Sequence, residues 1–450
     1  MKQDFPSKFR RSLDASWKEG IPANIMMVTL DYYLVPYALF LGASPLEIGL
    51  LVAIPHLLGS ISQLLAVRVI KELGSRLRFL IHGTGIQATF LVLTALLAFY
   101  PFPGRIPVLI ALATVFRILA NLIGTAWGSL ISEYLEPEQR GHYLGWRSRI
   151  AGIAGVAGLC LAGFLLEHIK TFSLALGFCL LFLSVAACRF ICAHFFRQMD
   201  DLPFEETRES RFTFLMFVRR FKESNFVKFT LYVASVTFAT QLAAPYFSVY
   251  MLRHLHLDYL QYMSIHMSAV IASLLAFPIW GRHADHVGNA RVLKTTSFLV
   301  PIIPFLWLIS AYPPYLIAVE LFAGFAWGGF TLCAANYIYD AVRPEKRVRC
   351  LGYFNLINGI AVFAGASLGG FLAENLPPFN GTSILTLMAL SGLARFAAHF
   401  LLSGRFQEVR LSVKPASSRE LFFSVLGLRP IAGLNREWNL FSWGKTSSGD

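Results

Sequence analysis

Residues 137–146 read PEQRGHYLGW, and 207 positions later residues 344–353 read PEKRVRCLGY. The similarity continues downstream at the same offset, where 145–167 (GWRSRIAGIAGVAGLCLAGFLLE) align with 352–374 (GYFNLINGIAVFAGASLGGFLAE). Four glycines, a Gly-Phe-Leu near the end and the closing glutamate coincide. A match over this length indicates an internal repeat. The chain is therefore predicted to consist of two related halves in parallel orientation.

The composition places most of the chain in lipid. Of 450 residues, 56% are hydrophobic and 14% are charged, whereas a soluble protein carries about 25% charged residues. A membrane-spanning helix needs about 20 mostly apolar residues, and a helix satisfies its own backbone hydrogen bonds in lipid. We expect an all-α integral membrane protein with twelve spans: 19–42, 46–70, 79–101, 106–131, 145–167, 172–195, 228–252, 261–280, 292–312, 315–339, 353–373 and 383–402.

The distribution of basic residues predicts the orientation. Of the 39 Lys and Arg residues, Arg105, Lys170 and Arg253 fall in loops on one side of the predicted membrane, and Arg117 and Arg395 fall inside spans. The rest lie on the other side or at the span ends that face it, and the positive-inside rule makes this side cytoplasmic, with both termini. The net charge of +13 then reflects topology and contact with anionic lipids, and we expect no nucleic-acid partner.

The spans and the polar segments between them define five regions. We expect a cytoplasmic leader, a six-helix bundle, a cytoplasmic linker, a second six-helix bundle and a cytoplasmic tail, at 1–18, 19–196, 197–227, 228–404 and 405–450. The linker ends in a basic, amphipathic stretch, which predicts a helix on the inner membrane surface.

A loop signature carries a family resemblance. GRHADHVGNAR at 281–291 matches Gly-x-x-x-Asp-x-x-Gly-x-x-Arg through Gly281, Asp285, Gly288 and Arg291. In this motif, and in its two parallel six-helix halves, the chain resembles the major facilitator superfamily (MFS) of transporters. The resemblance implies the MFS fold of two pseudo-symmetric bundles, with these four residues forming a loop that locks two helices at a cytoplasmic gate.

Two charged residues deep in spans are candidates for proton coupling, because such charges are costly in lipid. Asp31 and Arg117 lie 12 and 14 residues from the cytoplasmic ends of their spans, at depths of roughly 18 and 21 Å. The resemblance implies that both spans line a central cavity, and that an Arg at this place is typical of proton-coupled exporters. We expect Asp31 to bind the proton and Arg117 to tune its affinity. The alternatives are a static ion pair or no contact.

Polar and aromatic residues on the presumed cavity helices are candidates for the solute site. A cavity lined by aromatic rings and a few polar groups suits an amphipathic organic ligand. The alternative is that the rings pack between helices or face lipid. The candidates are Tyr32, Tyr33, Asn121, Trp127, Gln241, Tyr246 and Trp327.

Other polar residues within spans have less specific interpretations. Glu320 lies near the outer side, where it meets water at the rim or forms a second proton or cation site. Arg395 is expected to extend toward the cytoplasm. The histidines within spans are expected to bond between helices, and less often to relay protons; they are His56, His266 and His399.

Catalytic and metal motifs are not supported. GASLG at 365–369 matches G-x-S-x-G but lies in a predicted membrane helix, where no strand–turn–helix elbow can form. His283 and His286 have no evident third ligand, and the sequence contains no G-x-x-x-x-G-K-[ST]. We therefore expect no enzyme activity, no metal and no cofactor.

These observations predict a secondary active transporter of a small organic solute that works by alternating access and is coupled to protons. Arg117 favours export of an amphipathic compound, whereas the resembled antiporters carry a Pro that GLCLAG at 158–163 lacks. The alternatives are proton-coupled metabolite uptake, or a non-transporting receptor or scaffold with the same fold. We expect a monomer in the cell membrane, whose partners are the solute, protons and lipids.

Overall fold

The computed structural model describes residues 9–202 and 224–410. The predicted surface helix of the linker and most of the predicted tail lie outside these ranges. The description that follows concerns the described residues.

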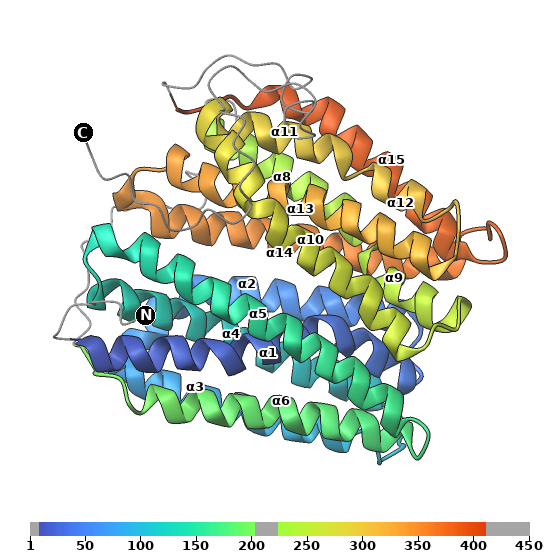
Figure 1. The fold of residues 1–450 in the computed structure, drawn as a ribbon, viewed down its shortest axis with the longest axis horizontal. Helices are drawn as coiled ribbons and strands as arrows, with labels where there is room; N and C mark the ends of the chain where they lie inside the picture. Colours follow the sequence, from blue (N-terminus) through green and yellow to red (C-terminus); the bar gives the residue numbers. More distant parts are fainter. Residues whose placement is uncertain (1–8, 203–223, 411–450) are drawn as a thin grey trace, which may run out of the picture.

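Each of the twelve expected spans coincides with helical structure (Figure 1). The N-terminal half contains α1 (Arg10–Phe40), α2 (Pro45–Leu73), α3 (Arg76–Leu96), α4 (Arg105–Tyr134), α5 (Pro137–Ile169) and α6 (Leu174–Phe196). The C-terminal half contains α8 (Asn225–Gln241), α9 (Ala244–Val249), the π-turn η2 (Tyr250–His254), α10 (Tyr259–Val287), α11 (Asn289–Leu299), α12 (Ile302–Leu306), α13 (Pro313–Ala341), α14 (Pro344–Asn375), α15 (Ser383–Leu402) and the 3₁₀ turn η3 (Ser403–Arg405).

By length and hydropathy alone, 10 helices of the described residues can cross a membrane. The other two expected spans lack a continuous, strongly apolar helix of that length. Asn24 and Asp31 interrupt the apolar run of α1, and the ninth span is divided into the two short helices α11 and α12.

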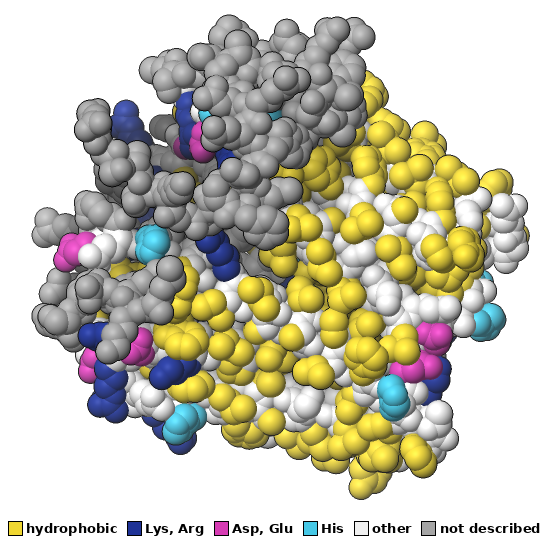
Figure 2. All heavy atoms as spheres, viewed as in Figure 1, with side chains coloured by type: hydrophobic (Ala, Val, Ile, Leu, Met, Phe, Trp, Pro, Cys, Tyr) yellow, Lys and Arg dark blue, Asp and Glu magenta, His cyan; other side chains and the backbone are white. Residues whose placement is uncertain are grey.

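The surface agrees with a membrane setting. Figure 2 shows a broad band of hydrophobic side chains across the face in view, with charged side chains collected toward the two ends of the molecule. The start of α1 and the end of α15 lie at the same end (Figure 1). We call this the inner end and the opposite one the outer end.

The same N-terminal helix cap occurs in both halves. Ser44 caps α2 and Asp258 caps α10, each in a capping box with the residue three positions later, Glu47 or Gln261. Such a box satisfies two otherwise unpaired backbone N–H groups at the helix start. The second helix of each half therefore begins in the same way, although the sequences around the caps differ.

Glycines set the close approach of helices within and between the halves. A Cβ on Gly158 would lie 2.8 Å from Ile25 of α1, and one on Gly163 would lie 2.7 Å from the Met263 sulfur of α10. A Cβ on Gly365 would lie 2.9 Å from Gln241. Close packing therefore accounts for both glycine-rich stretches, as small residues at membrane helix contacts generally do.

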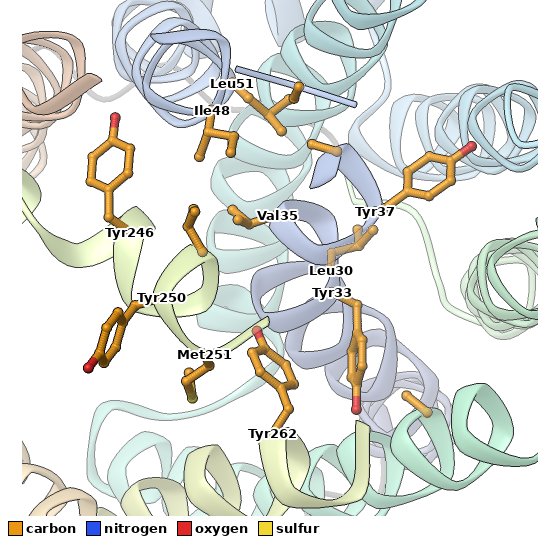
Figure 3. Close-up of a cluster of buried hydrophobic side chains, with 14 of the residues drawn as sticks. Leu30, Tyr33, Val35, Tyr37, Ile48, Leu51, Tyr246, Tyr250, Met251 and Tyr262 are labelled. Carbon is orange, nitrogen blue, oxygen red and sulfur yellow. The ribbon is translucent and has the colours of Figure 1, made fainter. Parts of the chain in front are cut away.

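Five hydrogen bonds close the outer end between the halves, and we call them the outer seal. The hydroxyls of Tyr262 and Tyr246 donate to the carbonyls of Tyr32 (2.6 Å) and Pro45 (3.1 Å). Figure 3 shows these two tyrosines in the buried cluster around α1 and α9. The other three bonds run from Arg253 to the Ala43 carbonyl (2.8 Å), from the Leu46 N–H to Glu374 (3.0 Å) and from the Tyr259 N–H to Glu167 (3.1 Å).

At the inner end, the segment after α15 folds back onto residues 281–291 of its own half, which we call the gate loop. Glu408 accepts a hydrogen bond from the Ala290 N–H at the start of α11 (2.8 Å). Arg410 pairs with Asp340 of α13 (2.9 Å) and with Asp285 of the gate loop (3.4 Å). We call residues 403–410 the C-terminal strap.

The N-terminal half contains an equivalent strap, residues 197–202 after α6. Asp201 accepts a hydrogen bond from Ser75 (2.5 Å) at the start of α3 and lies 207 positions before Glu408. Glu133 lies 207 positions before Asp340 and pairs with Arg76 (2.5 Å). The acidic partners therefore follow the repeat, whereas the arginine comes from α3 in one half and from the strap in the other.

Replacing Arg410 by Ala should loosen the C-terminal strap. It removes both ion pairs of a partly exposed guanidinium, which we expect to destabilise the protein by about 1 kcal/mol. Thermal unfolding of the detergent-solubilised protein measures the effect. Arg405→Ala is the matched control, because Arg405 is exposed and bonds only the Leu401 carbonyl among its described contacts. Equal melting temperatures for the two variants would contradict the role of the ion pairs.

Candidate functional site

The first candidate site is a cavity of about 180 Å³ inside the N-terminal half. Residues from α1, α2, α3, α4 and α6 line it, and most are apolar. Three lining residues can carry charge: Asp31 on α1, His56 on α2 and Arg117 on α4. The structure thus places the two predicted coupling residues around one space and adds a histidine to them. We call this space the N-half cavity.

Arg117 is bound to His56. The guanidinium Nη2 donates a hydrogen bond to His56 Nε2, while His56 Nδ1 lies 2.8 Å from the Val52 carbonyl. A carbonyl oxygen only accepts, so Nδ1 carries the hydrogen and Nε2 offers its lone pair to Arg117. This arrangement requires a neutral imidazole, and it ties α4 to α2.

Asp31 does not form a direct ion pair with Arg117, although both are described and face the same cavity. The exposed Asp31 side chain borders this interior cavity. The structure therefore disagrees with the static ion pair considered above. The carboxylate and the guanidinium share an apolar cavity, where their attraction is stronger than in water.

Gly59 makes room for this arrangement on α4. A Cβ at this position would lie 2.9 Å from Arg117 Cγ and 2.6 Å from Asn121 Nδ2. Both distances are shorter than a Cβ tolerates, so any other residue would displace one of the two side chains. Gly59 therefore allows α2 to approach the Arg117 side of α4 closely.

A second cavity, of about 460 Å³, lies in the C-terminal half. Its walls come mainly from α8, α9, α10 and α13, and Tyr32 of α1 contributes from the other half. Glu320 and Arg395 both border it. We call it the C-half cavity.

Arg395 does not extend toward the inner end, so the sequence-based prediction for it is wrong. The side chain is buried and donates from Nε to Ser391, one turn earlier on α15 (3.2 Å), and from Nη1 to the Val300 carbonyl (3.3 Å). Because the side chains of a helix tilt toward its N-terminus, Arg395 points away from the inner end. It therefore reaches the C-half cavity.

The structure divides the seven predicted solute-site residues. Tyr32 and Trp327 line the C-half cavity. Tyr33 and Tyr246 are fully buried and donate to the carbonyls of Leu159 (3.4 Å) and Pro45 (3.1 Å), so they serve packing and the outer seal. The remaining three line neither cavity: Asn121 abuts Gly59, Trp127 stacks under Arg147 at 4.2 Å, and Gln241 ends α8 against Gly365.

The gate-loop residues lie at the end of α10 and the start of α11. Gly288 joins the two helices with φ +88, and a Cβ there would overlap Glu408, so both its backbone and its space favour glycine. Asp285 pairs with Arg410, and the residue that caps α11 is Glu408. Gly281 lies about two turns before this corner and Arg291 about one turn after it. The loop thus contacts the C-terminal strap of its own half.

The cavities are also bordered by His56, Glu320 and Arg395, which the sequence analysis did not place in the solute or proton-coupling sites. The available signal was a polar side chain in an apolar span, which marks a functional candidate. Their partners were not visible, because contacts between distant helices depend on the rotation of each helix.

A scan against family models matches residues 22–239 and 229–443 to "Major Facilitator Superfamily". Among curated proteins, human "Solute carrier family 67 member A1" is 36% identical over 148 residues, covering 32% of this chain and 35% of that protein. Rat "Solute carrier family 22 member 18" is 35% identical over 128 residues, covering 28% and 31%. The matched region thus spans about a third of each relative.

Solved structures share the fold at low identity. The nucleoside transporter NupG superposes with a TM-score of 0.69 at 14% identity, covering 88% of this chain and all of that one. A bacterial homolog of the human lysosomal transporter Spinster gives 0.64 at 15% identity, covering 90% of this chain and 98% of that one. Similarity at this level concerns the fold alone.

Replacing Gly59 by Ala should disturb the Arg117 site. The added methyl overpacks α2 against Arg117 and Asn121, at a cost of about 1–3 kcal/mol. Thermal unfolding in detergent measures it. Gly124→Ala, on the adjacent α4, is the matched control, because a Cβ there meets nothing within 4 Å. A Gly59 variant as stable as the Gly124 variant would show that α2 does not constrain Arg117.

Proposed function

The chain belongs to the Major Facilitator Superfamily, and we propose that it is a secondary active transporter that couples the movement of a small organic solute to protons. The observation that carries the proposal is the N-half cavity, where Asp31, His56 and Arg117 meet on three different helices. Asp31 lies near the Arg117 guanidinium, whose own hydrogen bond goes to His56. A buried carboxylate in this setting is suited to binding and releasing a proton.

The coupling step is a competition for Arg117. In its present position the guanidinium is bonded to neutral His56 on α2. A deprotonated Asp31 on α1 attracts the guanidinium, whereas a protonated Asp31 leaves it with His56. Proton binding at Asp31 therefore changes whether α4 is tied to α1 or to α2.

The position of Asp31 relates this step to alternating access. The next residue, Tyr32, offers its backbone carbonyl to Tyr262 of the other half, as part of the outer seal. A shift of α1 toward Arg117 therefore acts directly on a bond that closes the outer end. Proton binding and opening of the outer end are in this way linked through two consecutive residues.

We propose that the protein works in the cell membrane and that transport runs outward. Arg117 supports export, since proton-coupled exporters in the resembled family carry an Arg at this place. The apolar linings of both cavities favour an amphipathic solute.

Asp31→Asn should uncouple transport from protons. The purified protein is reconstituted in liposomes, and flux of ethidium and of radiolabelled phenylalanine is followed with and without a gradient of 1 pH unit. Such a gradient supplies about 1.4 kcal/mol per proton, enough for about tenfold accumulation. Wild-type protein should accumulate at least one probe, whereas Asp31→Asn should only equilibrate it, because an amide cannot carry the proton.

Glu72→Gln is the control for this experiment, since Glu72 is an exposed carboxylate at the inner end of α2. It should accumulate the probe as the wild type does. Accumulation by Asp31→Asn at the wild-type level would exclude Asp31 as the coupling residue. A wild-type protein that moves neither probe under any gradient would count against transport of amphipathic solutes.

A further inference from the structure

The C-half cavity contains two opposite charges that do not neutralise each other directly. Glu320 accepts a hydrogen bond from Trp307 Nε1 (3.2 Å), and Arg395 is held by Ser391 and the Val300 carbonyl. Both side chains border the cavity and both are described, yet no ion pair within 4.0 Å joins them. Each charge therefore has one face left open toward the same space.

Two further polar atoms at this cavity lack partners. Thr240 Oγ1 and His266 Nε2 are buried and make no hydrogen bond within the described part of the chain. Both residues line the cavity. Buried polar atoms nearly always have a partner in a folded protein, so these two add unsatisfied hydrogen-bonding capacity to residues of the cavity wall.

The remaining wall is mostly apolar, and four of its side chains are aromatic. Phe247, Phe277 and Trp327 border the cavity from the C-terminal half, and Tyr32 closes it from α1. The Tyr32 ring lies against the His266 ring, with centroids 4.8 Å apart. Such a wall favours a flat or aliphatic body between the two charged ends.

We propose that the C-half cavity binds an amphipathic zwitterion, with an ammonium group at Glu320, a carboxylate at Arg395 and an apolar body against the aromatic wall. Charge balance decides between ligand classes. A cation would leave Arg395 uncompensated, an anion would leave Glu320 uncompensated, and an unpaired charge in a low-dielectric site is costly. A zwitterion compensates both, and the cavity is large enough for an aromatic amino acid.

This inference names a solute class for the proposed transporter and rests on that proposal only in treating the bound molecule as cargo. Tyr32 contacts this cavity and directly follows Asp31 in α1. A ligand in the C-half cavity therefore contacts the helix that carries the proposed proton site.

The experiment is a binding comparison on purified full-length protein in detergent, without any gradient. The probes are phenylalanine, its methyl ester (a cation), N-acetylphenylalanine (an anion) and N-acetylphenylalanine methyl ester (neutral). They share the ring and differ in charge. Kd is taken from thermal stabilisation as a function of probe concentration. Phenylalanine should bind at least about tenfold more tightly than each of the other three, because only it satisfies both charges.

Two substitutions, each removing one of the two charges, should then reduce the preference for phenylalanine. Glu320→Gln should weaken phenylalanine to the level of the N-acetyl anion, and Arg395→Gln should weaken it to the level of the methyl ester. Glu72→Gln should leave all four affinities unchanged. If Arg395→Gln does not fold, the Glu320→Gln result decides, and Arg395→Lys, which keeps the charge, should still prefer phenylalanine.

Tightest binding of the ester or the neutral probe, no binding of any probe, or an equal loss of all four in Glu320→Gln would each overturn the proposal. The outcome is independent of proton coupling. Charge-selective binding with pH-independent flux would retain the zwitterion site and reject Asp31 as the proton carrier. Coupled flux of ethidium with no binding of the phenylalanine series would retain Asp31 as the proton carrier and reject the zwitterion site.

Discussion

A polar group inside a bilayer has to find its partner within the protein, because the surrounding hydrocarbon offers none. This constraint organises the molecule. Helices satisfy the hydrogen bonds of the backbone. The glycines on α2, α5 and α14 let those helices approach closely enough to exclude lipid. Asp31 and Arg117 border a cavity in the N-terminal half, and Glu320 and Arg395 border one in the C-terminal half. Each cavity holds one acid, one histidine and one arginine.

The two halves resemble each other more closely in their side-chain contacts at the inner end than in their sequences. Each has an acid after its last helix that accepts a backbone hydrogen bond at the start of its third membrane-spanning segment. Each also has an acid near the inner end of its fourth that pairs with an arginine. The arginine is Arg76 from α3 in the first half and Arg410 from the strap in the second. The required charge is thus supplied at the same place from different positions in the chain. A sequence alignment alone would not pair these residues.

Much of the architecture was predictable from the sequence, since hydropathy and the repeat at 137–146 and 344–353 indicate spans and halves directly. The proximity of Asp31 and Arg117 also followed, because depth in a span can be counted in residues. Side-chain direction could not be predicted. Tyr33 packs toward Leu159 and Arg395 toward Val300, because neighbouring helices set the rotation of α1 and α15. The same limitation hid the bond between His56 and Arg117.

The outer seal joins side chains to main-chain atoms. In four of its five bonds the side chain belongs to the C-terminal half, from Tyr246, Arg253, Tyr262 or Glu374, and the N-terminal half offers only a carbonyl or an N–H. Every residue has a carbonyl, and every residue except proline has an N–H. At these four bonds the two halves therefore differ in their tolerance to substitution. Replacing the side chain of Tyr32, Ala43, Pro45 or Leu46 keeps the main-chain group that forms the bond, whereas replacing Tyr246, Arg253, Tyr262 or Glu374 removes the side-chain group that forms it.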